Sequence, residues 1–241
     1  MTDLLQISAN EMKFLVKRSV EGLGFTPGDQ LGAGARAAAC YQYGLANSAV
    51  IDAALSSLQA DIQGPVLVAK ATQASDEWLF DAQGQSALVQ AELALGSALS
   101  HGASAVRVRN TSQGMLVAPV LMAWLSKPLA QGTAQQSIAL YFTSQKGDQR
   151  CLWLAANGKP LGLYQPKSAV VASNELLVRV GEEDIDGHLI TDGADLLGWR
   201  ERSLDQGILV DLSLVTRLKT MMTDSFVPES DESRNSGAGP G

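Results

Sequence analysis

The chain has 241 residues, of which 46% are hydrophobic and 18% are charged, and its formal net charge is −7. This size and apolar content allow a domain with a large core. An acidic surface repels phosphate backbones, so we expect no nucleic-acid partner. No stretch approaches the ~18 consecutive apolar residues of a transmembrane helix, so we expect no membrane partner.

The N-terminal residues, MTDLLQISANEMKF, lack a basic region followed by an apolar run, which argues against a secretory signal. Two cysteines, Cys40 and Cys151, are too few for a disulfide framework. We interpret both as reduced thiols that fill core space. The sequence therefore predicts a cytoplasmic protein.

Three helices are predicted in the first 60 residues. Ser8 and Glu11 fit a capping box, which begins a helix that ends before Gly24. Thr26 and Pro27 begin a second helix that runs to Gly44, and a third covers about 47–60. The GAGARA motif at 32–37 has no preceding strand, so it indicates close helix packing rather than a dinucleotide-binding loop.

The character changes after Gly64 and Pro65, where alternating apolar residues predict strands. Asn157 and Gly158 favour the tight turn of a hairpin, so the later strands form an antiparallel meander. The strands are expected at 66–69, 77–80, 105–109, 137–143, 150–156, 160–165 and 175–181.

Helical patterns interrupt and follow these strands. A helix is expected over 86–100, and Pro119 interrupts a buried apolar run at 115–125. Asp211 is a good N-cap for a last helix that runs to about Asp224.

These elements predict an α+β fold with a helical N-terminal subdomain, a largely antiparallel sheet and a C-terminal helix. We expect one domain over 1–227, with a helical hairpin cluster at 8–60 and a sheet-containing body at 64–227. A polar segment rich in glycine and serine follows at 228–241.

The two histidines are the first candidates for chemistry. His101 follows the helix predicted at 86–100, where its cationic form is stabilised by the helix dipole. His188 alternates with Asp184 and Asp186, so an extended backbone would place all three side chains on one face. Such a set can bind a divalent metal ion. The alternative, an acidic surface loop, is favoured by Gly187, which makes a regular strand doubtful.

The C-terminal segment, SFVPESDESRNSGAGPG, has the composition of a loose polar tail. The alternative is an anion site, anchored to the body by an aromatic-Val-Pro sequence at 226–228. In that interpretation Ser233 caps a turn, Arg234 binds a carboxylate, and the backbone amides of Gly237 and Gly239 line the pocket.

The same segment resembles the C-terminal signature of a bacterial protein family that is catalogued as a domain of unknown function. The shared features are the aromatic-Val-Pro, the Ser233-Arg234 pair and the Gly-Ala-Gly stretch at 237–239. The resemblance implies that the segment is a functional element, and it implies no particular activity. The helical opening also resembles malate/lactate-type dehydrogenases, without carrying over any catalytic residue.

Two functions follow as hypotheses. The first is a small-molecule binding protein or metabolic enzyme that receives an anionic ligand at Arg234; no motif identifies a cofactor. The second is a non-catalytic subunit or scaffold that associates through its helical region at 9–60, for example as a homo-oligomer.

Overall fold

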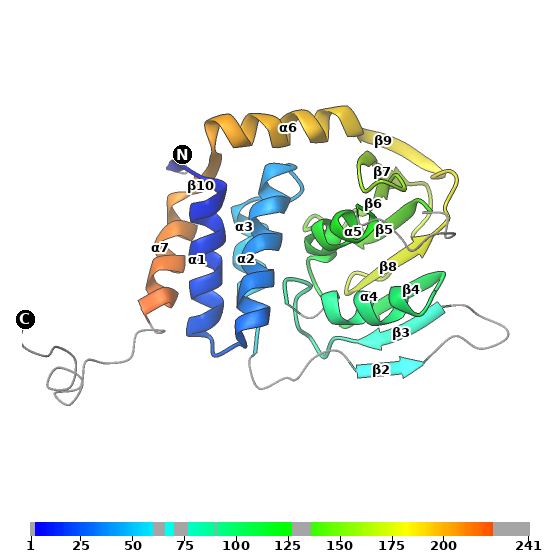
Figure 1. Cartoon of the computed structure of the whole chain (residues 1–241), viewed down its shortest axis with the longest axis horizontal. Helices are drawn as coiled ribbons and strands as arrows, with labels where there is room; N and C mark the ends of the chain where they lie inside the picture. The colour runs from blue at the N-terminus through cyan, green and yellow to red at the C-terminus, as the bar shows by residue number, and fades with distance from the viewer. Residues whose placement is uncertain (1–2, 60–65, 70–76, 90, 127–135, 224–241) are drawn as a thin grey trace, which may run out of the picture.

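The computed structural model of the chain describes residues 3–59, 66–69, 77–89, 91–126 and 136–223. Helices form one layer, and an eight-stranded sheet with its own helices lies beside it (Figure 1). The fold is α+β, the sheet is mostly antiparallel and the last described element is a helix, as predicted.

The N-terminal helices begin where the capping residues predict. The Ser8 hydroxyl accepts a hydrogen bond from the Glu11 amide at 3.0 Å. Thr26 and Asn47 cap the next two helices in the same way. The third helix ends at Ser56, earlier than expected. The helical layer consists of α1 (Ala9–Gly22), α2 (Pro27–Gln42), α3 (Ser48–Ser56) and α7 (Leu212–Thr223).

The two ends of the described chain meet in this layer. Strands β1 (Leu4–Ile7) and β10 (Ile208–Asp211), which the sequence did not predict, pair antiparallel. The buried Ser19 hydroxyl of α1 donates to the Leu218 carbonyl oxygen of α7 at 3.0 Å, across 199 positions of sequence. The helical layer is therefore assembled from both ends of the chain.

The sheet runs in the order β2-β3-β4-β8-β5-β6-β7-β9, and β3–β4 is the only parallel pair among the described strands. The predicted meander is present as β5, β6 and β7, with Asn157 and Gly158 in the turn. The strands are β2 (Val66–Ala69), β3 (Glu77–Asp81), β4 (Ala105–Arg109), β5 (Ile138–Thr143), β6 (Gln149–Leu154), β7 (Pro160–Pro166), β8 (Glu175–Val180) and β9 (Gly187–Asp192).

Two predicted features in the middle of the chain were wrong. Helix α4 covers Ala91–Ser100, because the residues before it form a parallel bridge between Ser86 and Ser112. Pro119 does not interrupt its apolar run; it lies in the first turn of α5 (Ala118–Leu125). Proline is accepted there because the first amides of a helix have no intrahelical partner. A short 3-10 helix, η1 (Gly114–Val117), leads into α5.

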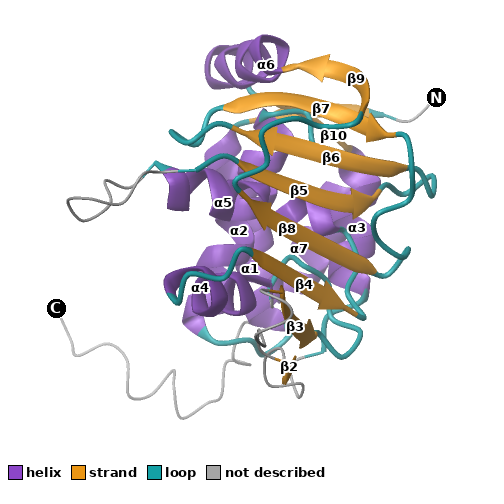
Figure 2. Ribbon diagram, turned by 90° about the vertical axis from the view of Figure 1, so that its right-hand side faces the viewer, coloured by secondary structure: helices purple, strands orange, loops and turns teal. Residues whose placement is uncertain are grey.

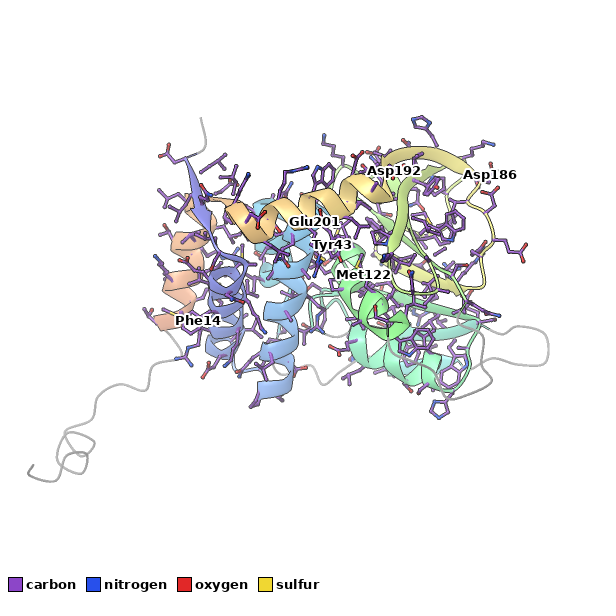
Figure 3. The ribbon with its side chains drawn as sticks, turned by 45° about the horizontal axis from the view of Figure 1, so that its top comes forward. Phe14, Tyr43, Met122, Asp186, Asp192 and Glu201 are labelled. Carbon is purple, nitrogen blue, oxygen red and sulfur yellow. The ribbon has the colours of Figure 1, made fainter. Side chains whose placement is uncertain are left out.

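The expectation that Gly187 disfavours a regular strand was also wrong, because β9 begins at this glycine. A Cβ there would come within 2.6 Å of the Gln165 carbonyl oxygen, so glycine permits the close pairing with β7. Helix α6 (Gly193–Gln206) follows and was not predicted. It runs from the sheet edge to the helical layer (Figure 1). There, the Arg200 guanidinium lies 5.8 Å from the centre of the Tyr43 ring. Tyr43 on the helical layer and Glu201, the next residue after Arg200 on α6, are labelled in Figure 3.

Most helices lie behind the sheet in Figure 2, and the main hydrophobic core fills the space between them and the strands. A smaller apolar cluster, which includes Tyr141, Cys151 and Ile185, lies on the other face.

Burial raises the pKa of the Cys151 thiol to about 12 and that of Cys40 well above its usual range. Both thiols are free and buried, as predicted. No helix of the described residues is long and apolar enough to cross a membrane.

Candidate functional site

The candidate site lies at the carboxyl ends of β3 and β4. These two strands are parallel and are joined through α4, so their carboxyl ends reach the same edge of the sheet. Ligands of open sheets bind outside the carboxyl ends of parallel strands, where the connecting loops diverge. The loops here are 82–86 after β3 and 110–113 after β4.

The two loops contain every non-glycine residue of the described chain that has a left-handed backbone. These are Gln83, Asn110 and Gln113, with φ of 55°, 52° and 51°. This conformation costs non-glycine residues roughly 1–3 kcal/mol each, and it persists only where the surroundings impose it. Such residues cluster at binding and catalytic sites, so their grouping points to function at this edge.

One carboxylate holds two of these residues in place. Asp81, the last residue of β3, accepts a hydrogen bond from the Gln83 amide at 2.8 Å and from Asn110 Nδ2 at 3.0 and 2.9 Å. Arg109 Nε lies 3.2 Å from its Oδ2 atom. The hydrogen bond from Gln83, followed by that from Asn110, lowers the pKa of Asp81 below its ordinary value. Asp81 is therefore ionised at neutral pH.

The network extends to a third strand through Asn174, which precedes β8. Asn174 Nδ2 donates to Asn110 Oδ1 at 3.0 Å, and the Asn174 carbonyl oxygen accepts from the Thr111 amide at 3.0 Å. The ends of β3 and β4 and the start of β8 are thus tied together by side-chain and backbone hydrogen bonds.

Buried polar residues support the loops from below. Thr111 and Gln85 are almost completely buried, and the Thr111 hydroxyl donates to the Gln85 carbonyl oxygen at 2.9 Å. The Gln85 side chain bonds both the amide and the carbonyl oxygen of Gln59, at 3.0 and 2.9 Å. These bonds fix the loops to the segment that follows α3, so the site has a rigid base.

A pocket of about 310 Å³ opens among these loops. This volume is at the small end of the range for small-molecule sites. The lining residues carry amide and hydroxyl groups and no charge, while most of the surface that they expose to the pocket is apolar. The lining residues are Gln83, Gly84, Asn110, Thr111, Ser112 and Asn174.

Arg109 is not among the lining residues, but it shares the Asp81 carboxylate with Asn110, which lines the pocket. The Arg109 side chain is 42% exposed, and Asp81 is its one partner among the described residues, through Nε. The two terminal nitrogens therefore remain available to an anion. The neighbouring Arg107 is instead shared between Glu77 and Glu175, at 2.6 and 3.2 Å.

Two larger cavities, of about 810 and 480 Å³, lie where the C-terminal end of α6 meets β1 and α2. They share Gln6, Gln42, Ser203, Gln206 and Gly207. None of the described residues that line them is a left-handed non-glycine residue. All three pockets are open to solvent, and the smallest one is the better candidate site because left-handed non-glycine residues line it.

The residues considered for a metal site lie elsewhere. His188 is exposed on β9 opposite Gln165, and Asp186 forms an exposed ion pair with Lys167 at 2.5 Å in the region labelled in Figure 3. Asp184 accepts a hydrogen bond from the Ile185 amide at 2.8 Å. Within the described ranges, no group of three His, Cys, Asp or Glu residues is arranged to hold a metal ion.

Of the remaining predicted residues, His101 is described by the structure and the C-terminal candidates are not. His101 lies at the C-terminal end of α4, where its Nδ1 is 2.7 Å from the Ser97 carbonyl oxygen, so the predicted capping position is confirmed. Arg234, Ser233, Gly237 and Gly239 lie outside the described residues. The anion site proposed for them stays a prediction.

Sequence reasoning missed the pocket residues altogether. One signal was present: a polar run, Asn110 to Gln113, directly follows a predicted strand within a strand-helix-strand unit. This signal does not identify the site, because the sequence of a polar run does not show which of its asparagine or glutamine residues have a left-handed backbone.

Solved structures with a similar arrangement of elements include several dehydrogenases. A dehydrogenase from Sinorhizobium meliloti aligns with a TM-score of 0.62 and 10% identity, over 91% of this chain and 100% of that one. The malate dehydrogenase of Pyrococcus horikoshii OT3 aligns with a TM-score of 0.61 and 9% identity, over 95% and 99% of the two chains. The sulfolactate dehydrogenase of Methanocaldococcus jannaschii gives a TM-score of 0.58 and 11% identity, over 92% and 97%.

The chain has the fold of these dehydrogenases. At 9–11% identity the likeness concerns the fold alone. The amino-acid sequence matches no protein-family model and no curated protein.

Proposed function

We propose that this protein binds a small organic carboxylate in the pocket at the carboxyl ends of β3 and β4. The observation that carries the proposal is the grouping of three left-handed residues in the two loops of this pocket: Gln83 and Asn110 line it, and Gln113 follows directly in the second loop. The fold provides the strands, and the loops that line the pocket are held by the hydrogen bonds of Asp81 to Gln83 and Asn110.

Charge and size support an organic acid as the ligand. The unshared terminal nitrogens of Arg109 form a planar fork that matches a carboxylate. The pocket is small and uncharged, which suits a compact acid with further polar groups. Malate and sulfolactate, named for two of the similar structures, are acids of this kind.

The groups described at the pocket support binding and orientation more directly than proton transfer. The chain has two histidines, and neither lines this pocket. Both cysteine thiols are buried, and burial raises their pKa values. We therefore propose a ligand-binding role for the pocket; the anion site predicted at the C-terminal Arg234 stays a separate proposal.

Thermal unfolding in the presence of malate, sulfolactate and lactate tests the proposal. A ligand at one hundred times its Kd stabilises a protein by about 2.7 kcal/mol. This raises Tm by ~5 °C or more in a chain of this size. Inorganic sulfate serves as a control for general anion effects.

The matched variants are Arg109→Gln and Arg150→Gln. Arg150 also pairs with an aspartate, Asp148, but it lies in the β5–β6 hairpin away from the pocket. We expect Arg109→Gln to reduce the ligand-induced shift and Arg150→Gln to leave it unchanged. The proposal fails if no organic acid raises Tm, or if both variants respond like the wild type.

A further inference from the structure

The outer face of the β1–β10 pair carries two leucines that are open to solvent. Leu4 lies opposite Asp211 and Gln6 lies opposite Leu209, so the side chains of these four residues share one face of the pair. Leu4 and Leu209 are 58% and 61% exposed there. The solvated face of an antiparallel pair is normally polar. Two exposed leucines on it therefore indicate a contact that this chain alone does not supply.

The apolar surface continues onto the C-terminal end of α6. Leu204 is 60% exposed and lines the larger of the two cavities at this end of the helix, and Trp199 lines the smaller one together with Leu209. Both cavities include Gln6, whose side-chain amide donates to the Gln206 carbonyl oxygen. The N-terminus, β10 and the end of α6 meet at one corner of the molecule, at the upper left of Figure 1. We call the following residues the corner patch: Leu4, Trp199, Leu204 and Leu209.

Opposite charges accompany the corner patch in equal number. The basic residues Lys13 and Arg202 each line one of the two cavities. The acidic residue Asp205 lines the larger cavity, and Asp211 lies on the outer face of the strand pair. These charges sum to zero, whereas the whole chain carries a net charge of −7. Two copies of an acidic protein repel each other, and this repulsion is weakest where the local charge cancels.

Two of these charges, Arg202 and Asp205, suit a contact with an identical chain. Both are exposed, and they lie three residues apart on α6. Within the described ranges neither forms an ion pair, with the other or with any third residue. In a two-fold contact, residue i of one copy meets residue j of the other and j meets i. Arg202 of each copy can therefore pair with Asp205 of the other, which makes two ion pairs.

We propose that the corner patch is the contact surface for a second copy of this chain, in a two-fold symmetric dimer. The end of α6 forms a ridge between the two cavities, because Ser203 and Gln206 line both of them. A ridge with a cavity on each side is complementary in shape to its own rotated copy. Burial of the leucines of both copies supplies the hydrophobic gain, and the ion pairs fix the register. The proposal is independent of the ligand pocket, which is lined by other residues.

Sedimentation equilibrium of the full chain over a range of concentrations tests the proposal. We expect the wild type to reach the mass of two chains. Leu209→Asp should raise the Kd of the dimer about a hundredfold, because the dimer contains the residue twice and each lost contact is worth about tenfold. Leu93→Asp is the matched control, since Leu93 on α4 is 60% exposed and lies outside the corner patch. The control should keep the Kd within about twofold of the wild type.

Reversal of the two charges tests the geometry of the contact. Arg202→Asp and Asp205→Arg each bring like charges together, so each should raise the Kd about tenfold. The double variant again places opposite charges against each other and should return the Kd to within about threefold of the wild type. Both positions are exposed on α6, so these variants test the contact even if Leu209→Asp does not fold.

Three results would overturn the proposal. The first is a wild type that sediments as a monomer at every concentration. The second is a dimer whose Kd is the same in Leu209→Asp as in the control Leu93→Asp, which would place the contact on another surface. The third is a double variant that associates no better than the single charge variants, because Arg202 and Asp205 would then not meet across a two-fold axis.

Discussion

Gly34 of α2 lies against the backbone of Lys13 on α1, and a Cβ at position 34 would come within 2.4 Å of the Lys13 carbonyl oxygen. This contact gives the physical reason for the small residues in the GAGARA stretch. The two helices approach so closely that glycine alone fits at their crossing.

Gly34→Ala should therefore destabilise the protein by about 1–3 kcal/mol, because the clash is with backbone and the helices must separate. Gly96→Ala on α4 is the control, since nothing lies within 4 Å of its Cβ position. It should stabilise the protein by up to ~1 kcal/mol. Urea unfolding measures both, and an equal effect of the two changes would contradict the packing argument.

A buried arginine joins the helical layer to α4. The Arg36 side chain is 4% exposed; its Nε donates to the Leu88 carbonyl oxygen at 2.7 Å, and its Nη1 pairs with Glu92. Burial lowers the pKa of Arg36, and Glu92 partly offsets this effect. Glu92→Gln should cost about 1–3 kcal/mol of unfolding free energy, because it leaves a buried charge without its counter-charge.

The control is Glu21→Gln, which removes one partner of Arg18 in a half-buried pair within α1. A change within about 0.5 kcal/mol is expected there. If both variants lose the same stability in urea, Glu92 does not compensate the buried charge.

The pH dependence of the pocket loops follows from the pKa of Asp81, which is lowered from its ordinary value of 3.8. A carboxyl with a lower pKa in the folded state stabilises the fold above the ordinary value, and this contribution is lost as the pH falls through the folded value. Protection of the amides in 82–86 and 110–113 should stay constant from about pH 7 to 5 and decrease below about 4.

Hydrogen exchange with mass spectrometry, corrected for intrinsic exchange rates, measures this protection. In Asp81→Asn the same amides should be less protected at pH 7 and should show a weaker dependence on pH. Identical profiles for the variant and the wild type would show that Asp81 does not hold these loops.

The C-terminal anion site is tested through Arg234. If the guanidinium binds the ligand, Arg234→Ala should lower the ligand-induced rise in Tm without changing Tm in the absence of ligand. Arg202→Ala on α6 serves as the control, because Arg202 lines a different cavity. An unchanged ligand response in Arg234→Ala would remove the C-terminal segment from the site.

Association through the helical layer is the alternative function predicted from the sequence. Phe14 on α1, labelled in Figure 3, is 52% exposed, and Leu31 on α2 is exposed to the same extent. Under this alternative, light scattering at increasing concentration should show a mass above that of one chain, and Phe14→Ser should lower it. Leu93→Ser removes a comparably exposed residue of α4 and should not. A constant monomer mass contradicts the alternative.

The sequence predicted those elements whose boundaries are determined by local chemistry. Ser8, Thr26 and Asn47 each cap the helix that their position indicates, because a side-chain oxygen can satisfy a free amide within three residues. The segment at 86–89 was wrongly assigned to a helix because the partner of Ser86, Ser112, is distant in sequence. Strand β9 was missed because the need for Gly187 is imposed by β7.

The candidate site was harder to predict for the same reason. Asn110 has a left-handed backbone because Asp81 and Asn174, from two other strands, bind its side chain. No pattern within the polar run at 110–113 encodes these contacts. The candidates predicted from the sequence lie elsewhere. Asp184, Asp186 and His188 are exposed to solvent, and His101 caps a helix.

The pairing of Ser19 with Leu218 and of β1 with β10 has a consequence for biosynthesis. Helices α1 and α3 are synthesised before α7, and the faces that they pack against α7 cannot be covered until that helix has been made, after the entire sheet. The sheet-containing segment should therefore acquire structure as an internal insertion while the early helices wait. Premature release of the nascent chain would leave those helices open to chaperones and proteases.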